Sequence, residues 1–459
     1  MQQIFPYFLQ LQIFQQDEYD GKKFFHWILR HFFVRKIENK KPLIWTARAK
    51  LLFSLAILLA ISIIMLWTKV SGVAGFLAGI ILATQPYIYL LLANTLVAPY
   101  ERQQKEKIKK ITEAKILSFK KLKVIGITGS YGKTSTKEFL YHILKNKFHV
   151  LRTPGSYNTP LGIAQVVDLE LDDSYTYFIC EMGAYKKGDI AEICDMVHPT
   201  YGMLTGINEQ HLETFGSLQN TTQAKFELIA SLPKNGFGVV NGDNALITNA
   251  LPNYQQKIMQ YGFSDTLFSI RNIAQTHEGS SFTLILDGKK YKAQTTLLGK
   301  SNLQNILGAA TMSYLLGMTP AEIVKGIATL QAVPHRLEIK KMPSMTIIDD
   351  AYNSNVDGFQ EAIALLTSFT SAKILVTPGI VDLGNQTVAI HESLGKLLDG
   401  VDHIFLVGES DRTKGLEKGI QNKKKIEKIA SIKQVWGAIE KLQLKNPVVL
   451  LENDLPDNY

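Results

Sequence analysis

The stretch LKVIGITGSYGKTS, residues 122–135, decides the fold of the larger part of this chain. Its first seven residues form a mostly apolar run typical of a buried strand, and Lys133 opens a segment whose apolar residues recur at helical spacing. Between them lies GSYG, a turn with two glycines. A strand, a glycine turn and an amphipathic helix in this order predict an α/β domain with a parallel sheet.

The same turn predicts a phosphate-binding loop. Glycines let backbone N–H groups close around phosphate oxygens, the helix N-terminus adds positive potential, Lys133 can reach the terminal phosphates, and the Thr134 hydroxyl can hold Mg²⁺. The spacing differs from the general P-loop, which has glycine where this chain has Ile127, and a structural glycine turn is the alternative. The residues assigned to nucleotide binding here are Gly129, Ser130, Gly132, Lys133, Thr134 and Ser135.

Two more apolar strands end in polar side chains. Residues 175–180 run into Glu181, and residues 201–207 run into Asn208, with His211 three positions later. Ligands of open α/β sheets bind beyond the carboxyl ends of the strands, so we expect these three side chains to converge on the phosphates. A carboxylate and an imidazole there are plausible Mg²⁺ ligands, although each residue taken singly also has a structural explanation.

Length and composition limit the class of protein. The 459 residues suggest about three domains. A hydrophobic content of 46% and a mean hydropathy of +0.02 exclude a disordered or fibrous chain. With two cysteines there is no disulfide framework, which favours a reducing compartment.

The net charge of +9 is unevenly distributed. Residues 21–50 and 101–123 together carry fourteen net positive charges, so the remaining residues sum to five net negative charges. The basic character belongs to two patches and not to the globular body. We therefore expect no nucleic-acid partner.

Between the two basic patches the sequence predicts a membrane hairpin. Residues 51–68 carry no charge, and after Lys69 the next charged residue is Glu101. Because a bilayer core of about 30 Å needs roughly 20 apolar residues, we expect transmembrane helices at about 51–68 and 73–98, with Pro86 tolerated as a kink. Buried core helices and a secretory signal peptide are the alternatives, and both fit these long runs less well.

The basic flanks give the hairpin an orientation. Segments rich in Lys and Arg stay on the cytoplasmic side, and both outer flanks are basic while the turn has only Lys69. We expect a multi-pass anchor in the cell membrane over residues 1–104. Both termini and the remaining domains should lie in the cytoplasm.

The second half of the chain changes pattern twice. Residues 257–298 form short alternating segments with an Asp287-Gly288 turn, which predicts an antiparallel subsheet. Helices follow from about Asn302, and a new set of apolar strands begins near residue 333. The predicted domains are therefore 1–104, 105–332 and 333–459.

Nine sequence blocks, in order over about residues 122–385, resemble the Mur ligases, in particular those that join D-alanyl-D-alanine to a muramoyl tripeptide. The blocks are GITGSYGKTSTKE, EMGA, NEQHLETFGS, AKFELI, NGDN, GKSNLQNILGA, VPHRLE, DDAYNSN and TPGIVDLG. The resemblance implies a P-loop central ATPase domain and a C-terminal Rossmann-like domain that closes over it. It also implies an ATP-dependent amide ligase of peptidoglycan precursor synthesis, in which ATP phosphorylates a carboxylate and an amine attacks the acyl phosphate.

The resemblance also implies roles for individual residues. Lys133 would neutralise the transferring phosphoryl group, and Thr134 with Glu181 would hold one Mg²⁺. His211 matches the position of a second Mg²⁺, and Lys225 matches a lysine that is carbamylated in many members and supports that metal. Asn302 and Asn305 match nucleotide contacts, Arg336 and Asp350 match residues that reach ATP on domain closure, and Asn208, Tyr352, Asn353 and Asn355 lie where the family lines its substrate cleft.

Two departures leave the acceptor open. Ser301 stands where the family usually has histidine, and residues 1–100 do not resemble the family domain that grips UDP. The acceptor is then a UDP-linked muramoyl peptide or a lipid-linked one. The alternatives are a related ligase acting on another carboxylate, such as a polyglutamate, and a membrane-tethered ATP-binding scaffold.

Overall fold

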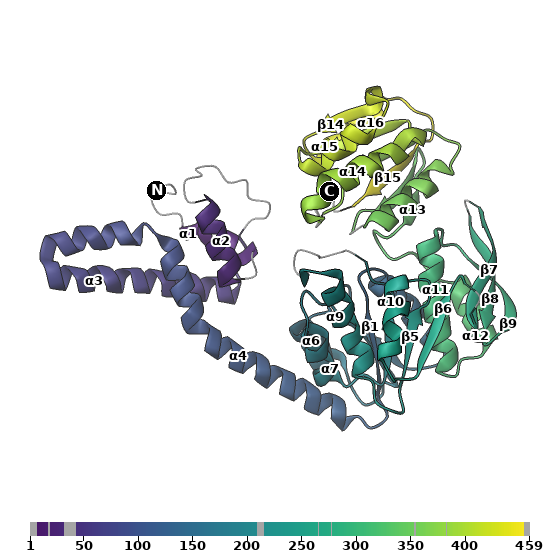
Figure 1. Ribbon diagram of the computed structural model, residues 1–459, viewed down its shortest axis with the longest axis horizontal. Helices are drawn as coiled ribbons and strands as arrows, with labels where there is room; N and C mark the ends of the chain where they lie inside the picture. The colour runs from purple at the N-terminus through teal and green to yellow at the C-terminus, as the bar shows by residue number, and fades with distance from the viewer. Residues whose placement is uncertain are drawn as a thin grey trace. The chain divides into compact units, whose positions relative to one another are not determined.

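The computed structural model describes residues 7–16, 19–31, 43–208, 215–264, 266–276, 278–352, 355–381 and 383–453 (Figure 1). Two of the candidate site residues, His211 and Asn353, lie outside these ranges. Internal contacts divide the chain into two compact units, Met1–Ile108 and Lys109–Tyr459.

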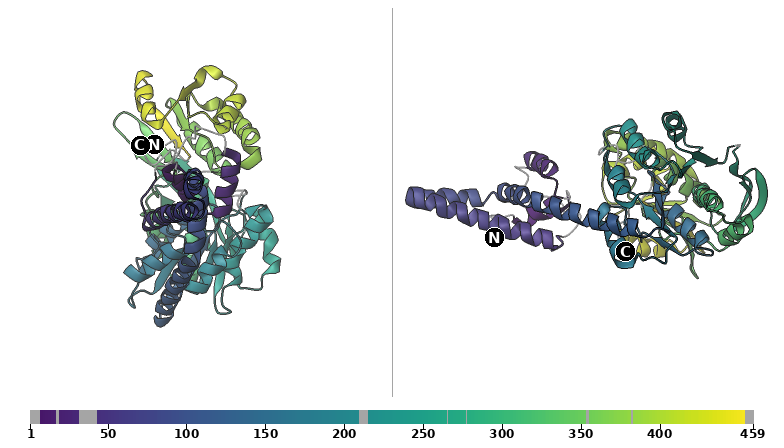
Figure 2. Two further views of the ribbon diagram at one scale, coloured as in Figure 1. Left: turned by 90° about the vertical axis from the view of Figure 1, so that its left-hand side faces the viewer. Right: turned by 90° about the horizontal axis from the view of Figure 1, so that it is seen from below.

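The first unit contains a helical hairpin. Its helices are α1 (Tyr7–Gln16), α2 (Gly21–His31), α3 (Ala47–Ala83) and the first part of α4 (Pro86–Ser118). Helix α3 folds back on itself at Gly72, whose φ of 58° and ψ of −133° suit glycine alone (Figures 1 and 2). A Cβ on Gly75 would lie 1.9 Å from the Trp67 carbonyl oxygen, and one on Gly79 would lie 2.9 Å from the Ile64 Cα. The two legs therefore meet through glycine backbone.

The second leg of this hairpin differs from the single helix predicted over 73–98. It consists of two helical pieces, and α4 begins at Pro86 because proline has no N–H for the helical ladder and suits the first helical position. Arg48, at the start of α3, forms a 2.9 Å ion pair with Glu101 and donates a 3.2 Å hydrogen bond to Asn94. The run thus returns antiparallel along the first leg, with the kink at the predicted proline.

The outer surface of the hairpin is apolar. Met65, Val73 and Ile81 are 67%, 77% and 67% exposed. Helix α3 is long and apolar enough to cross a membrane, and no other helix in the described ranges meets the same length and composition test.

A three-layer α/β domain begins the second unit. In the described part of the chain, its sheet has nine strands in the order β2-β3-β1-β4-β5-β6-β7-β8-β9. Their bounds are β1 (Lys123–Thr128), β2 (Val150–Arg152), β3 (Tyr177–Glu181), β4 (Tyr201–Leu204), β5 (Phe237–Asn241), β6 (Ile258–Gly262), β7 (Phe268–Thr276), β8 (Gly279–Leu286) and β9 (Lys289–Thr295). Strands β1 to β6 are parallel. Strands β7 to β9 are antiparallel, which confirms the predicted subsheet.

Helices cover both faces of this sheet because successive strand residues point to opposite sides. Their bounds are α5 (Lys133–Leu144), α6 (Pro160–Glu170), α7 (Asp189–Val197), α9 (Leu218–Ala230), α10 (Ala245–Ala250), α11 (Lys300–Leu315) and α12 (Pro320–Ala328). Helices α5, α11 and α12 bury Ile125 and Ile127 on one face. Helices α6, α7 and α9 bury Val124 and Phe178 on the other.

The last two turns of α4 belong to this domain. Ile116 is 5% exposed within its core, and the Lys115 Nζ donates to the carbonyl oxygens of Val167 at 2.7 Å and Asp168 at 2.9 Å. These contacts fix the segment that leads into β1.

A second sheet follows in the same unit, with the order β10-β11-β15-β12-β13-β14. Its strands are β10 (Glu338–Lys341), β11 (Thr346–Asp350), β12 (Lys373–Thr377), β13 (His403–Val407), β14 (Ile426–Ile429) and β15 (Val448–Glu452), and its helices are α13 (Val356–Thr367), α14 (Thr387–Gly395), α15 (Asp411–Gly419) and α16 (Val435–Lys441). Only the edge strand β10 is antiparallel among these described strands. Helices α13 to α15 pack on one face and α16 on the other, so the second unit has two sheets, each covered by helices on both faces, in agreement with the predicted α/β class.

We predict that a fragment of residues 105–459 folds without the hairpin, because the second unit buries its own core and includes the end of α4. Its near-UV circular dichroism and a cooperative thermal transition check this. A fragment that starts at residue 119 loses the burial of Ile116 and should melt several degrees lower. Aggregation of the longer fragment without a cooperative transition would contradict the boundary.

Candidate functional site

The loop between β1 and α5 is shaped by close backbone approaches. Gly129 and Gly132 have φ values of 155° and 77°. A Cβ on Gly129 would lie 2.2 Å from the Thr205 Oγ1, and one on Gly132 would lie 2.5 Å from the Asn305 Oδ1. Any larger residue would open the loop, so both glycines are required by the geometry.

The Lys133 side chain folds back so that its amine contacts this loop. The half-buried Nζ donates to the carbonyl oxygens of Gly129 at 2.8 Å and Ser130 at 3.1 Å. Burial lowers the pKa of Lys133 to about 8, against a raising effect of Glu181, while the positive charge of Arg336 lowers it further. The Lys133 amine thus lies in the field of a second positive charge, at the start of a helix, and this arrangement suits a polyanion.

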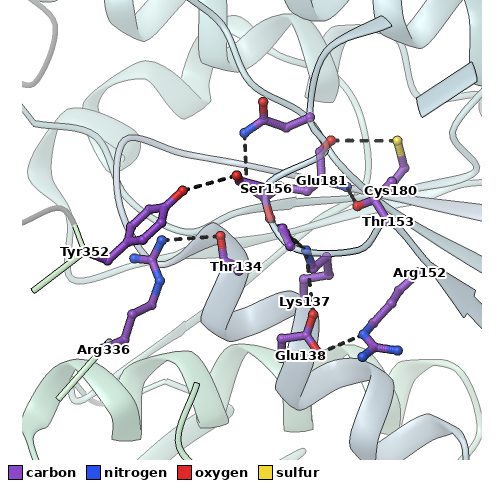
Figure 3. A network of polar contacts seen from close by, with 12 residues as sticks. Thr134, Lys137, Glu138, Arg152, Thr153, Ser156, Cys180, Glu181, Arg336 and Tyr352 are labelled. Atoms are coloured by element: carbon purple, nitrogen blue, oxygen red, sulfur yellow. Dashed lines mark hydrogen bonds and ion pairs between the residues drawn. The ribbon is translucent and has the colours of Figure 1, made fainter. Parts of the chain in front are cut away.

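Glu181 closes strand β3 next to the loop. It is 1% exposed, and its two carboxylate oxygens accept hydrogen bonds from the Lys137 Nζ at 3.0 Å and the Asn158 Nδ2 at 3.2 Å. Burial alone would raise the pKa of Glu181, but Lys137 and Lys133 outweigh it and hold that pKa below its ordinary value. Figure 3 shows Glu181 within the polar network that includes Lys137. The carboxylate is thus ionised.

Lys137 was missed by the sequence reasoning. Its side chain is fully buried, and its Nζ also donates to the Gly155 carbonyl oxygen. The signal was available, because Lys137 follows Lys133 by four residues and therefore lies on the same face of α5. Of these two lysines, one turn apart, Lys137 pairs with the buried carboxylate and Lys133 donates to the loop carbonyl oxygens.

Asn208 follows strand β4, and Lys225 lies in helix α9. The Asn208 backbone N–H donates to the Ser130 Oγ at 3.3 Å, so the backbone of this residue lies beside the loop. Lys225 in α9 is 3% exposed, with its Nζ 5.7 Å from the centre of the Phe215 ring. Burial, followed by the charge of Lys133, lowers the pKa of Lys225 to about 7. The described residues contain no group of three or more His, Cys, Asp or Glu side chains that could hold a metal ion.

Asn302 and Asn305 lie at the start of α11. The Asn302 Nδ2 donates to the Leu298 carbonyl oxygen at 2.8 Å, and the Asn305 Oδ1 accepts from the Thr136 Oγ1 at 3.2 Å. Asn305 thereby ties the second turn of α11 to the first turn of α5 beside Gly132. Both residues shape the loop surroundings in addition to facing a cavity.

Position 301, where the sequence departs from the family pattern, has an unexpected partner. The Ser301 N–H at the start of α11 donates at 2.7 Å to the Glu361 Oε1. Glu361 belongs to α13, a helix that packs on the second sheet. Burial raises the pKa of Glu361. No sequence pattern indicated this contact, because it joins residues sixty positions apart.

Arg336 also crosses to the phosphate loop. Its Nη2 donates to the Thr134 Oγ1 at 3.5 Å, and its guanidinium carbon lies 4.6 Å from the centre of the Tyr352 ring. The Tyr352 hydroxyl in turn donates to the Ser156 Oγ at 3.1 Å (Figure 3). The structure thus brings Arg336 to the first turn of α5 and Tyr352 to Ser156, which follows β2.

Two other residues of this region are tied to backbone. The Asp350 Oδ1 accepts from the Leu337 N–H at 3.0 Å, and burial raises the pKa of Asp350 to about 6. The Asn355 side chain accepts from the Gly358 N–H at 3.0 Å and caps α13. Asn355 therefore has a structural role whatever else it contacts.

A cavity of about 730 Å³ lies beside the loop. This volume is in the range of small-molecule sites. The predicted residues that line it are Gly132, Ser135, Asn302, Asn305, Arg336, Asp350 and Asn355. Glu181, Lys225 and Tyr352 are not among its lining residues, so the site has a cavity side and a strand-end side that meet at the loop.

Comparison with known proteins agrees with this architecture. Residues 127–313 match the Mur ligase middle domain, and residues 335–452 match the Mur ligase glutamate ligase domain. The UDP-N-acetylmuramoyl-tripeptide–D-alanyl-D-alanine ligase of Escherichia coli strain K12 is 32% identical over 308 residues, which are 65% of this chain and 67% of that protein. The enzyme of the same name from Buchnera aphidicola subsp. Acyrthosiphon pisum is 30% identical over 74% of this chain and 75% of its own.

Solved structures give the same result. MurF from Acinetobacter baumannii superimposes with a TM-score of 0.69 at 26% identity, over 76% of this chain and 77% of its own. MurF from Thermotoga maritima, solved in complex with ADP, gives a TM-score of 0.68 at 26% identity, over 76% and 80%. The family models and the solved structures cover both sheets and the loop that carries Lys133. This chain therefore belongs to the Mur ligases, ATP-dependent enzymes that form amide bonds.

Proposed function

We propose that this chain joins D-alanyl-D-alanine to the terminal carboxylate of a muramoyl tripeptide. The observation that carries the proposal is the meeting of Arg336 with Thr134 at the phosphate loop, next to the buried Glu181. Relatives at about 30% identity over two thirds or more of their length carry this activity in their names. The chain thus has both the relatives and the charged groups that the reaction needs.

The first chemical step is transfer of the γ-phosphoryl group of ATP to a carboxylate oxygen of the acceptor, with ADP as the leaving group. Phosphoryl transfer depends mainly on positioning and charge stabilisation. Lys133 and Arg336 supply positive charge at the start of α5, and the N-terminus of that helix adds positive potential for the phosphates. Asn302, Asn305 and Asp350 hold the nucleoside in the cavity.

Magnesium fits the donor set of this site. Mg²⁺ is usually bound by one or two protein oxygens together with phosphate oxygens and waters, so the lack of a larger carboxylate or histidine cluster in the described ranges is compatible with it. Thr134 and Glu181 would hold it, and when bound it would neutralise phosphate charge. The roles of His211 at a second metal and of Lys225 as its carbamylated support remain part of the proposal.

In the second step the amine of D-alanyl-D-alanine attacks the acyl phosphate carbon. A C–N bond forms, the C–O bond to phosphate breaks, and the amine loses a proton. Because water would hydrolyse the acyl phosphate, the contacts that Arg336, Tyr352 and Glu361 make across the site serve to exclude solvent. Asn208 and Tyr352 lie on the strand-end side, from which the acceptor would enter.

The first unit supports a membrane location. We propose that the hairpin over residues 47–98 spans the cell membrane, with both termini and the ligase domains in the cytoplasm. The exposed apolar legs, the tip at Lys69 and the basic flanks support this. An anchored ligase could also take a lipid-linked muramoyl peptide from the plane of the bilayer, and that acceptor is the second candidate.

We predict that purified protein with ATP, Mg²⁺, D-alanyl-D-alanine and a UDP-linked muramoyl tripeptide releases ADP and forms a pentapeptide. Lys133→Ala should lower kcat by a factor on the order of 10³, because the phosphoryl oxygens lose a positive partner. Lys187→Ala, an exposed lysine of the same domain, is the control. ADP release only with a lipid-linked muramoyl peptide favours that acceptor. Release with another carboxylate, such as a polyglutamate, favours a related ligase. ATP binding without acceptor-stimulated turnover favours a membrane-tethered ATP-binding scaffold.

We predict that ATP binding weakens at alkaline pH. Lys133 has a pKa of about 8 in the free protein, and a bound polyphosphate requires the protonated amine. Above that pH, binding must take up a proton, so the Kd should rise by about tenfold per pH unit, whereas below it the Kd should stay nearly constant. Isothermal titration calorimetry from about pH 7 to about pH 10 measures this slope.

Lys133→Arg is the matched variant for this pH dependence, because arginine keeps its charge over the whole range. Its affinity should be lower or similar, but without the alkaline slope. An identical slope in the variant would assign the effect to another group.

We predict that a cysteine at the hairpin tip is reached from outside the cell. Lys69→Cys should react with a membrane-impermeant maleimide on intact cells, and Lys107→Cys only after permeabilisation, because the basic flank stays cytoplasmic. The native Cys180 and Cys194 are buried and give little background. Equal labelling of both variants on intact cells would exclude the proposed topology.

A further inference from the structure

The backbone around Arg336 is strained on both sides. His335 has a φ of 61° and Leu337 a φ of 49°, so both chain neighbours of Arg336 occupy the left-handed region although neither is glycine. This region is unfavourable for leucine in particular, and such residues persist only where the surroundings determine them. Something must therefore hold this turn in place.

Two consecutive carboxylates at the end of β11 hold it. The Asp349 Oδ2 contacts the His335 Nδ1 at 2.9 Å, and the Asp350 Oδ1 accepts from the Leu337 N–H at 3.0 Å. Each strained residue thus has its own carboxylate. Arg336 lies between these two residues in the chain, and neither of the two contacts uses its side chain.

Asp349 is itself fixed. Its side chain is 5% exposed, its Oδ1 accepts from the Ala351 N–H at 3.3 Å, and its Oδ2 also accepts from the Lys340 Nζ at 2.6 Å. The His335 N–H donates to the Glu338 Oε2 at 3.2 Å. The imidazole is therefore attached to an anchor that cannot move independently of β11.

The strained turn determines where the guanidinium of Arg336 lies. With His335 and Leu337 held, the side chain leaves the turn towards Thr134 and stacks on Tyr352, whose own N–H donates to the His335 carbonyl oxygen at 3.3 Å. Relaxation of either neighbour to ordinary φ values would rotate the backbone that carries Arg336.

We propose that Asp349 is a positioning residue for the ligase reaction: through His335 it keeps the turn in its strained form and so aims Arg336 at the phosphoryl group. This inference rests on the proposed function, since it assigns to Arg336 a part in phosphoryl transfer. Asp349 touches no substrate and acts only through the turn.

The direct test is steady-state kinetics of two variants of the full-length protein. Asp349→Asn removes the charge that holds the imidazole, and His335→Asn keeps a residue that tolerates positive φ but cannot reach Asp349 as the ring does. Each should lower kcat by about 10-fold to 10²-fold, as expected for a displaced catalytic group, while KM for ATP changes far less. Asp402→Asn is the matched control, because Asp402 also pairs with a lysine but precedes β13 at the opposite end of the sheet.

A double-mutant cycle separates positioning from general destabilisation. In an Arg336→Ala background, Asp349→Asn should cause no further loss of kcat, since nothing is left to position. Losses that multiply in the double variant, or a kcat of Asp349→Asn equal to that of the parent, would overturn the inference. If Asp349→Asn does not fold, His335→Asn takes its place in the same cycle, and additional loss of kcat in its double variant with Arg336→Ala would overturn the inference.

The cycle also distinguishes the two levels of the proposal. If Arg336→Ala turns over like the parent, the role given to Arg336 in the proposed function is wrong. If Arg336→Ala is impaired while Asp349→Asn and His335→Asn are not, the proposed function stands and Asp349 has no positioning role.

Discussion

The charge balance around Glu181 is the constraint on which the rest of the site depends. A buried carboxylate is costly unless it is paired, and here Lys137 pairs with it while Lys133, one helical turn earlier, remains directed at the loop. The two lysines can hold these places only if α5 begins directly after the glycine loop. The strand, the loop and the helix therefore have to form as one unit before any ligand chemistry is possible.

Local patterns predicted much of this. The strand–turn–helix stretch at 122–144, the polar residues after β3 and β4 and the antiparallel meander all follow from hydrophobic periodicity and turn residues. The hairpin in the first unit also follows from two uncharged runs, and even its kink coincides with Pro86. In each case neighbouring residues alone decide the outcome.

Contacts between distant segments could not be predicted in this way. Nothing in the sequence indicates that Glu361 would meet the start of α11, or that Asp349 would hold His335, because these pairs depend on how two separate sheets and their connection pack. Lys137 is an intermediate case: its spacing from Lys133 was visible, but its burial against Glu181 depends on β3. The positive φ of Leu337 is hidden from sequence altogether, since leucine is a residue that normally avoids it.

The contact of Glu361 with Ser301 has a consequence for product release. A helix start leaves backbone N–H groups without helical partners, and α11 obtains one of its acceptors from α13 across the site. If the second sheet and its helices moved away from α11, that N–H would bond to water and the cavity would lose the lining residues that precede and include α13. An opening that released nucleotide would therefore also remove one acceptor from the start of α11, at the cost of one hydrogen bond between an amide and a carboxylate.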